Sequence, residues 1–295
     1  SGKFGERWIE LCKAYGADVQ VIKVPWGKSV LPADIKKLLD ADKSIKAVFV
    51  PLCETSTGVT ADIEGIGRVV KETPAVLVVD AVSGVGVTDL QTDQWSVDVV
   101  ASASHKGLML PQGVAFVAVS PKAEALMQKS TAPKYYFDLK KYKKAAAQTD
   151  TPFTPAIGIV IALVESLKMV RETGIDHLLK KYERLAKGTR AAAQALGLSL
   201  LADPSCISNA VTAMTLPAGV DGEKLAKIMR DTHGISVAGG QDQLKGKIIR
   251  IAHMGVIDEY DILTGISCLE KVLKEMGYSF TLGAGVAAAQ KAFNS

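Results

Sequence analysis

Short apolar segments alternate with longer amphipathic ones through the first half of the chain. The apolar segments predict β-strands at 19–24, 47–52, 75–80, 97–104 and 114–119. The amphipathic segments between them predict helices at 4–15, 33–41, 62–72 and 121–127. Strands that alternate with helices in this way indicate the α/β class, with a mostly parallel sheet wrapped by helices.

The pattern changes after residue 144. Two long helical patterns, at 156–171 and 175–196, are followed by a mixture of strands and shorter helices. The strands are expected at 210–216, 235–238 and 248–253, and the helices at 221–232 and 259–275. Such a mixture predicts a smaller α+β unit. We place the boundary in the polar stretch 147–151, which gives a large domain over 1–147 and a small C-terminal domain over 148–295.

Composition narrows the class of protein. With 295 residues, of which 48% are hydrophobic, the chain can build two cores. The net charge of +4 is small, and the one basic run, at 140–144, fits a solvated helix face better than a nucleic-acid site. No apolar run approaches the about 20 residues of a membrane span. We therefore expect neither nucleic-acid nor membrane partners.

The cysteines indicate a reducing compartment. Cys12, Cys53, Cys206 and Cys268 are scattered along the chain, with no CxxC pair and no histidine at metal-ligand spacing. Unpaired thiols of this kind are typical of cytoplasmic proteins, so we expect a cytoplasmic location and no metal site.

Two charged residues stand at the ends of apolar strands. Asp80 closes the strand at 75–80, and Lys106 follows the strand at 97–104. The carboxyl ends of parallel strands share one edge of an α/β sheet, where ligands bind. An amine and a carboxylate at that edge are what pyridoxal 5′-phosphate needs: the amine forms the Schiff base, and the carboxylate holds a proton on the pyridine nitrogen. The alternatives are a solvent-facing lysine and a strand-end aspartate bonded to backbone.

Six segments in order resemble the class V aminotransferases of fold type I, the branch of alanine–glyoxylate, serine–pyruvate and serine–glyoxylate aminotransferases. The segments are GKFGERW at 2–8, CETSTGV at 53–59, VDAVS at 79–83, SHKGLMLP at 104–111, FTP at 153–155 and RIAHMG at 250–255. They span nearly the whole chain, and six in register carry more weight than any one alone.

The resemblance implies roles around the cofactor ring. Lys106 corresponds to the Schiff-base lysine and Asp80 to the partner of the pyridine nitrogen. Val82 corresponds to the apolar contact under the ring, and Phe4 to the aromatic side chain stacked over it. Packing in the core is the alternative for Phe4.

Further roles concern the cofactor's polar groups. The hydroxyl of Thr55 would donate to the phenolic oxygen, and Ser56 and Thr57 are alternatives for this role. For each of the three residues, the other explanation is that its hydroxyl caps a turn. His105, where many relatives carry Gln, keeps a donor for the phosphate. Thr154 resembles the residue that reaches the phosphate of the neighbouring subunit, which implies a homodimer; a plain Thr-Pro domain junction is the alternative.

Arg250 matches the arginine that clamps the substrate α-carboxylate through two parallel hydrogen bonds. Its apolar neighbours in the sequence argue against an ordinary surface ion pair. The function implied is transamination between a small amino acid, alanine or serine, and a 2-oxo acid, glyoxylate or pyruvate. Lys106 would move the proton from the substrate Cα.

Two alternatives stay open. Family members carry an N-terminal portion ahead of residue 1 that includes the phosphate-binding turn, so we expect a truncated form that could bind no cofactor and act only as a subunit. A cysteine desulfurase would need a nucleophilic thiol, for which Cys206 is the candidate. Some subunits assigned to soluble hydrogenases also resemble this family, but the cysteines here lack the spacing of iron–sulfur ligands, so we interpret that label as inherited and not as a sign of hydrogenase chemistry.

Overall fold

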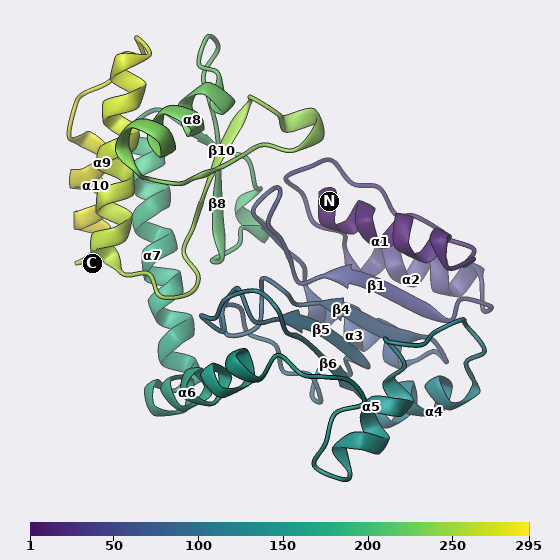
Figure 1. The fold of residues 1–295 in the computed structure, drawn as a ribbon. Helices are drawn as coiled ribbons and strands as arrows, with labels where there is room; N and C mark the ends of the chain where they lie inside the picture. The colour runs from purple at the N-terminus through teal and green to yellow at the C-terminus, as the bar shows by residue number, and fades with distance from the viewer. Residues whose placement is uncertain (295) are drawn as a thin grey trace.

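Three parallel strands and one antiparallel strand form the first sheet of the computed structural model, which describes residues 1–294 (Figure 1). The order is β1 (Ala47–Pro51), β4 (Val76–Asp80), β5 (Val99–Ala103) and β6 (Ala115–Val119). Strands β1, β4 and β5 run parallel, and β6 pairs with β5 in the antiparallel sense. The predicted α/β class with a mostly parallel sheet is confirmed.

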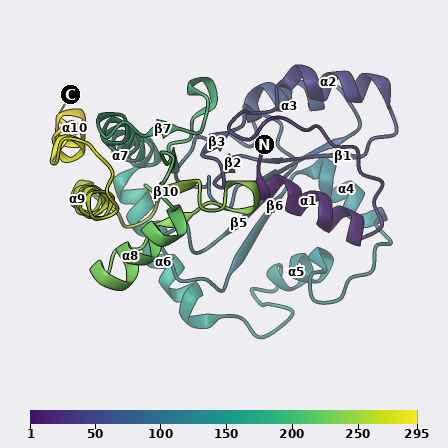
Figure 2. The same cartoon turned by 90° about the horizontal axis from the view of Figure 1, so that it is seen from above.

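Helices cover both faces of this sheet. Leu77 and Val79 of β4 pack in one core with helices α2 (Pro32–Ala41) and α3 (Ile63–Lys71). The alternate residues of β4, 76 and 78, pack on the other face against α4 (Pro121–Lys129). Figure 2 shows α2 and α3 on one side of the sheet and α1 and α5 on the other. Burial on both faces explains why the β4 sequence is continuously apolar instead of alternating.

Helix α1 (Lys3–Ala14) lies along β1. The ring of Trp8 packs against that of Phe49, with 5.3 Å between their centroids. The strand predicted at 19–24 is wrong, because no described residue pairs with this extended segment. Ile22 packs on the core while its neighbours are exposed. The alternating pattern therefore arises because one side of the segment is buried. It does not arise from pairing with a strand.

The second unit is built on an antiparallel sheet, as expected for its α+β pattern. Its strand order is β7 (Ser199–Leu200), β8 (Val211–Thr215), β10 (Ile248–Ala252) and β9 (Ala238–Gly239). The covering helices are α7 (Ile175–Ala195), α8 (Gly222–His233), α9 (Glu259–Glu275) and α10 (Ala284–Phe293). Their apolar faces form one core around the fully buried Tyr182, Leu225 and Met214. Figure 1 shows α7, α9 and α10 side by side at the edge of this unit.

The segment between the units carries α5 (Leu139–Ala146) and α6 (Ile157–Thr173). Helix α5 holds the basic run and buries none of its residues, which confirms the solvated helix face. The predicted boundary at 147–151 falls between these two helices and stays a prediction. The remaining elements are β2 (Cys53–Glu54), β3 (Val59–Thr60) and the short 3₁₀ turns Pro204–Cys206 and Asp242–Leu244. Within residues 1–294, no helix has both the length and the apolar character needed to cross a membrane.

Candidate active site

Charged and polar side chains gather at the carboxyl edge of the first sheet. Asp80 is the last residue of β4, and Lys106 follows the end of β5 by three residues. Thr55 lies just beyond β1, after the first strand of the β2–β3 hairpin. Because β1, β4 and β5 are parallel, the three residues are delivered to the same edge, where α/β sheets bind ligands.

The segments that carry Asp80 and Lys106 are in direct contact. The N–H of Ala81 donates to the carbonyl of Ala101 at 2.8 Å, which continues the β4–β5 pairing past Asp80. A Cβ on Gly107 would lie 2.1 Å from the carbonyl oxygen of Val85, so only glycine allows this approach. The residue that follows Lys106 is thus in close contact with the loop that follows Asp80.

The pKa of the Cys53 thiol also shows that these charged side chains lie near one another. Burial raises its pKa to about 12, while the Ser208 hydrogen bond and the Lys106 charge lower it and the Asp80 and Glu54 charges raise it. Three charged side chains from different strand ends therefore act on one buried atom.

Lys106 is half-buried, more exposed than the apolar residues before it suggest. Its Nζ makes no hydrogen bond or ion pair with any of residues 1–294, so the amine is free to react. Its loop is fixed from within: Ser104 donates its hydroxyl to the carbonyl of Pro111 at 2.7 Å, and the N–H of Leu110 donates back to Ser104. A free amine on a fixed loop is the arrangement that a nucleophilic lysine requires.

The structure distinguishes the three neighbouring hydroxyls. Ser56 donates to Glu54 and accepts from the N–H of Lys3, and Thr57 donates to the carbonyls of Ser1 and Glu54. The hydroxyl of Thr55 has no partner within the described chain, although the residue is 6% exposed. Thr55 is therefore the hydroxyl available to a ligand, in preference to its two neighbours.

Arg250 reaches this edge from the second unit. It lies in β10, where its Nε donates to the carbonyl of Gly239 at 2.9 Å. Its Nη1 donates to the carbonyl of Thr55 at 2.8 Å, a contact between residues 195 positions apart. Burial lowers the pKa of this guanidinium, and the Glu54 charge partly offsets the shift. Two of the five N–H groups of an arginine are thus used, and three remain for a ligand.

Glu54 has a structural role that the sequence analysis missed. Its carboxylate is 1% exposed and accepts from the N–H groups of Phe4 at 3.3 Å and Gly5 at 2.9 Å. A carboxylate at a helix N-terminus satisfies free amides and complements the helix dipole. It anchors α1 and places Phe4, which is half-buried with the Arg7 guanidinium 4.9 Å from its ring centroid, beside the Thr55 segment.

The other predicted residues differ in their surroundings. Val82 is half-buried and donates its N–H to Oδ1 of Asp80 at 3.1 Å, so it belongs to this edge. His105 is exposed, and its ring makes no hydrogen bond within the described residues. Thr154 is also exposed, in the segment before α6, and no contact within the described chain joins it to Lys106. The phosphate-binding roles of His105 and Thr154 stay predictions.

Cys206 does not have the surroundings of a nucleophilic thiol. It ends a 3₁₀ turn, where its Sγ lies 3.7 Å from the carbonyl of Gly27. Burial is the largest of the effects that raise its pKa, which disfavours the reactive thiolate. Among residues 1–294, no group of three or more His, Cys, Asp or Glu side chains is placed to hold a metal ion.

Comparison with known proteins gives this edge a family context. Residues 6–255 match the family model for aminotransferase class-V. The chain belongs to the class-V aminotransferase family. This family member is 36% identical to the L-aspartate–glyoxylate aminotransferase of Paracoccus denitrificans, over 99% of this chain and 75% of the relative. It is 47% identical to a protein named as the small subunit of soluble hydrogenase in Synechococcus sp., over 100% of this chain and 78% of the relative.

A solved aminotransferase shares the fold of this class-V chain. The ureidoglycine–glyoxylate aminotransferase of Bacillus subtilis superposes with a TM-score of 0.93 at 28% identity, covering 100% of this chain and 77% of the other. The resemblance to class V aminotransferases of fold type I is confirmed.

The free groups at the sheet edge fit pyridoxal 5′-phosphate. The Lys106 amine and the Thr55 hydroxyl have no partner within the described chain, and both lie at the edge that carries the Asp80 carboxylate. An amine suits the cofactor's aldehyde, a hydroxyl its phenolic oxygen and a carboxylate its ring nitrogen. Three unlike polar groups at one sheet edge match three of the four polar groups of this cofactor, the fourth being its phosphate.

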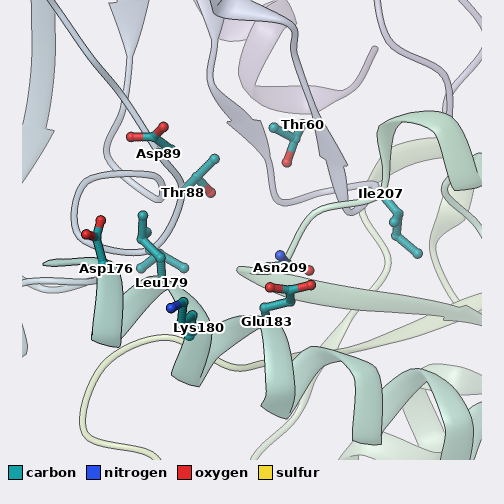
Figure 3. Close-up of a pocket in the computed structure, with 10 residues that line it drawn as sticks. Thr60, Thr88, Asp89, Asp176, Leu179, Lys180, Glu183, Ile207 and Asn209 are labelled. Carbon is teal, nitrogen blue, oxygen red and sulfur yellow. The ribbon is translucent and has the colours of Figure 1, made fainter.

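A separate cleft of about 460 Å³ contains none of these candidate residues. Figure 3 shows it between the loop that carries Thr88 and Asp89 and the first turns of α7, with Asp176 and Lys180 on the helix side. Asp89, Asp176 and Lys180 are exposed, and the half-buried Glu183 pairs with Lys187. We place the chemistry at the sheet edge and not in this cleft.

His253 lies in the same motif as Arg250. Its surroundings lead us to expect that the free energy of unfolding falls in acid. Its fully buried ring donates from Nδ1 to the carbonyl of Asn209 at 3.2 Å, and Nε2 has no partner among residues 1–294. Burial, with the nearby charge of Arg190, lowers its pKa from 6.5 to about 3 despite the hydrogen bond to Asn209. The folded state thus holds the ring neutral where the unfolded state binds a proton.

Because the folded pKa is depressed, this residue leaves stability unaffected above pH 6.5 and destabilises the fold as the pH falls towards about 3. The loss should approach ~1.4 kcal/mol of unfolding free energy per pH unit in that window. Urea unfolding from pH 7 to pH 4 should show a shallower pH dependence for His253→Asn than for the wild type. Identical slopes would contradict the assignment.

Proposed function

We propose that this protein transfers an amino group between a small amino acid, alanine or serine, and a 2-oxo acid, glyoxylate or pyruvate. Pyridoxal 5′-phosphate would be held by Lys106, Asp80 and Thr55, with Phe4 and Val82 against its ring. Family membership supports the reaction type, and the names of the Paracoccus and Bacillus relatives support glyoxylate as an acceptor. We also propose a cytoplasmic location, which the four unpaired cysteines support.

The contact between Arg250 and Thr55 carries this proposal. It brings a cation from the second unit to the edge where the first unit presents its free amine. An arginine with spare N–H groups binds a carboxylate through two parallel hydrogen bonds, and amino acids and 2-oxo acids both carry a carboxylate next to the reacting carbon. One guanidinium can therefore hold both substrates of a transamination in the same orientation.

Each residue has a defined task in this reaction. Arg250 binds the substrate carboxylate and turns Cα–H towards Lys106. The neutral Nζ of Lys106 takes that proton and returns it on the way to product. Asp80 holds a proton on the cofactor's ring nitrogen. The cofactor, when bound, supplies an electron-withdrawing ring that stabilises negative charge at Cα.

Product analysis tests the proposed function directly. The 295-residue chain is supplied with pyridoxal 5′-phosphate, L-serine or L-alanine, and glyoxylate or pyruvate, and the products are followed by mass spectrometry. Glycine should form from glyoxylate, with one 2-oxo acid formed per amino acid consumed. In a parallel reaction that contains L-cysteine and a thiol reductant, sulfide release without these products would favour a desulfurase. The absence of any cofactor-dependent turnover would favour a subunit without catalytic function.

We further propose that two copies of the chain form a homodimer through α6. One stripe of this helix exposes apolar side chains at helical spacing, with Ile157 61%, Ile161 63% and Val164 50% exposed. Ser166, on the opposite side, is buried and donates to the carbonyl of Leu108 at 2.6 Å, two residues beyond Lys106. A helix with its polar contact inward and its apolar stripe outward suits a protein interface.

The dimer proposal predicts a change of mass in solution. Ile161→Asp places a charge in the apolar stripe and should convert a dimer to a monomer in light scattering after size exclusion. Leu282→Asp is the matched control, because Leu282 is 66% exposed on the loop before α10, and this variant should stay dimeric. A monomeric wild type, or a dimeric Ile161→Asp variant, would refute the interface.

A further inference from the structure

The carboxylate of Asp80 is held by two donors from different parts of the fold. Its Oδ1 accepts from the N–H of Val82 at 3.1 Å, within the turn that follows β4. Its Oδ2 accepts from the indole Nε1 of Trp8 at 3.0 Å, across 72 residues of sequence. With one donor on each oxygen, the carboxylate group cannot rotate about its Cβ–Cγ bond without breaking a hydrogen bond.

The indole donor is itself fixed. The Trp8 ring packs against Phe49 of β1 with an interplanar angle of 33°. The N-terminus of its helix is anchored by the buried carboxylate of Glu54. Trp8 also lies four residues after Phe4, and residues four apart share one face of a helix. Helix α1 thus presents an aromatic ring and an N–H donor on the face that meets the sheet edge.

The chemistry of the indole limits what it can do here. Its N–H donates and never accepts, so Oδ2 must act as an acceptor in this contact. Each carboxylate oxygen has two acceptor positions, and each protein donor occupies only one of them. The remaining positions are left for a donor in the ligand, in an orientation that the two protein donors set.

We propose that Trp8 is a positioning residue, which orients Asp80 towards the protonated ring nitrogen of the cofactor. This inference rests on the proposed function and adds a residue to it. The indole does not touch the reacting atoms; it acts through the carboxylate. Loss of the N–H should therefore weaken cofactor binding only while the carboxylate is present.

The hydrogen bond can be tested in the 295-residue chain before any cofactor is added. The chain has tryptophans at 8, 26 and 95, so a ¹H–¹⁵N spectrum should show three indole resonances, and Trp8→Phe identifies the one from Trp8. In Asp80→Ala, that indole proton should move upfield and exchange faster with solvent. An unchanged Trp8 resonance would overturn the contact and the role built on it.

The role is tested by a double-mutant cycle on the affinity for pyridoxal 5′-phosphate, measured by absorbance titration. Trp8→Phe keeps a ring against Phe49 and removes the N–H, and it should weaken binding roughly 10-fold. In the Asp80→Ala background, the same change should have little further effect. Trp95→Phe is the control, because Trp95 precedes β5, at the opposite end of the parallel strands, and should leave the affinity unchanged.

Equal losses from Trp8→Phe in both backgrounds would show that the ring acts by packing alone and would overturn the positioning role, while the proposed function would stand. A wild-type protein that binds no pyridoxal 5′-phosphate would instead overturn the proposed function, and this role with it.

Discussion

Replacing Lys106 with alanine should lower kcat for transamination by about 10⁴-fold. The loss is large because this side chain is proposed both to attach the cofactor and to move the substrate proton. The fold should be unaffected, since Nζ makes no hydrogen bond or ion pair within residues 1–294. The unfolding free energy should stay within about 0.5 kcal/mol of the wild type. Steady-state kinetics with alanine and glyoxylate, and urea unfolding of the same preparations, measure both effects.

Lys122→Ala is the matched control and should behave in the opposite way. The Lys122 amine donates to the carbonyls of Thr73 and Ala75, just before β4 begins, and lies 3.7 Å from a carboxylate oxygen of Asp98. This is the amino end of the sheet, away from the proposed site. Its removal should cost stability and leave kcat unchanged. A Lys106→Ala protein that turns over at the wild-type rate would refute the assignment.

Arg250→Ala should lower kcat/KM for amino acids by about 10² to 10³-fold, because truncating one member of a buried charge pair costs ~3–4 kcal/mol. The guanidinium also donates to the carbonyls of Gly239 and Thr55, so the variant should lose some stability as well. Arg250→Lys keeps the charge without the planar fork and should recover only part of the activity. Initial rates at several substrate concentrations separate KM from kcat.

A substrate without a carboxylate separates binding from folding effects. Alanine and ethylamine differ by that group alone, so wild type and Arg250→Ala should differ strongly with alanine and little with ethylamine. If both substrates lose activity equally, the arginine supports the structure and does not bind the carboxylate. A thermal unfolding curve for each variant shows whether it is folded at the assay temperature, so that only the activities of folded proteins are compared.

The positions of Asp80 and Lys106 could be predicted because they depend on local patterns. Each follows an apolar strand, and parallel strands deliver their carboxyl ends to one edge. The strand at 19–24 shows the limit of such patterns. The alternation of apolar and polar residues at 19–24 arises because Ile22 is partly buried. A strand also needs a neighbouring strand to pair with, and the sequence of the segment does not show whether one is present.

Other features depend on contacts that local patterns do not contain. Glutamate is seldom buried, so a buried position for Glu54 is not expected. The amides of α1 that compensate its charge lie far from it in the sequence, and no residue near Glu54 indicates this contact. Trp8 lies in the motif at 2–8, and the family resemblance implies no role for it, although its spacing from Phe4 places both on one helix face. The approach of Arg250 to Thr55 joins two units, and family resemblance was the only available signal for it.

Mapping the attachment site of the cofactor tests the central claim most directly. The 295-residue chain is incubated with stoichiometric pyridoxal 5′-phosphate, reduced with borohydride, digested and sequenced by mass spectrometry. The account predicts one phosphopyridoxyl group, on Lys106, and a smaller yield from an Asp80→Ala protein. Modification of a different lysine, or an even spread over the exposed lysines, would contradict the convergence of Lys106 and Asp80 on one ring.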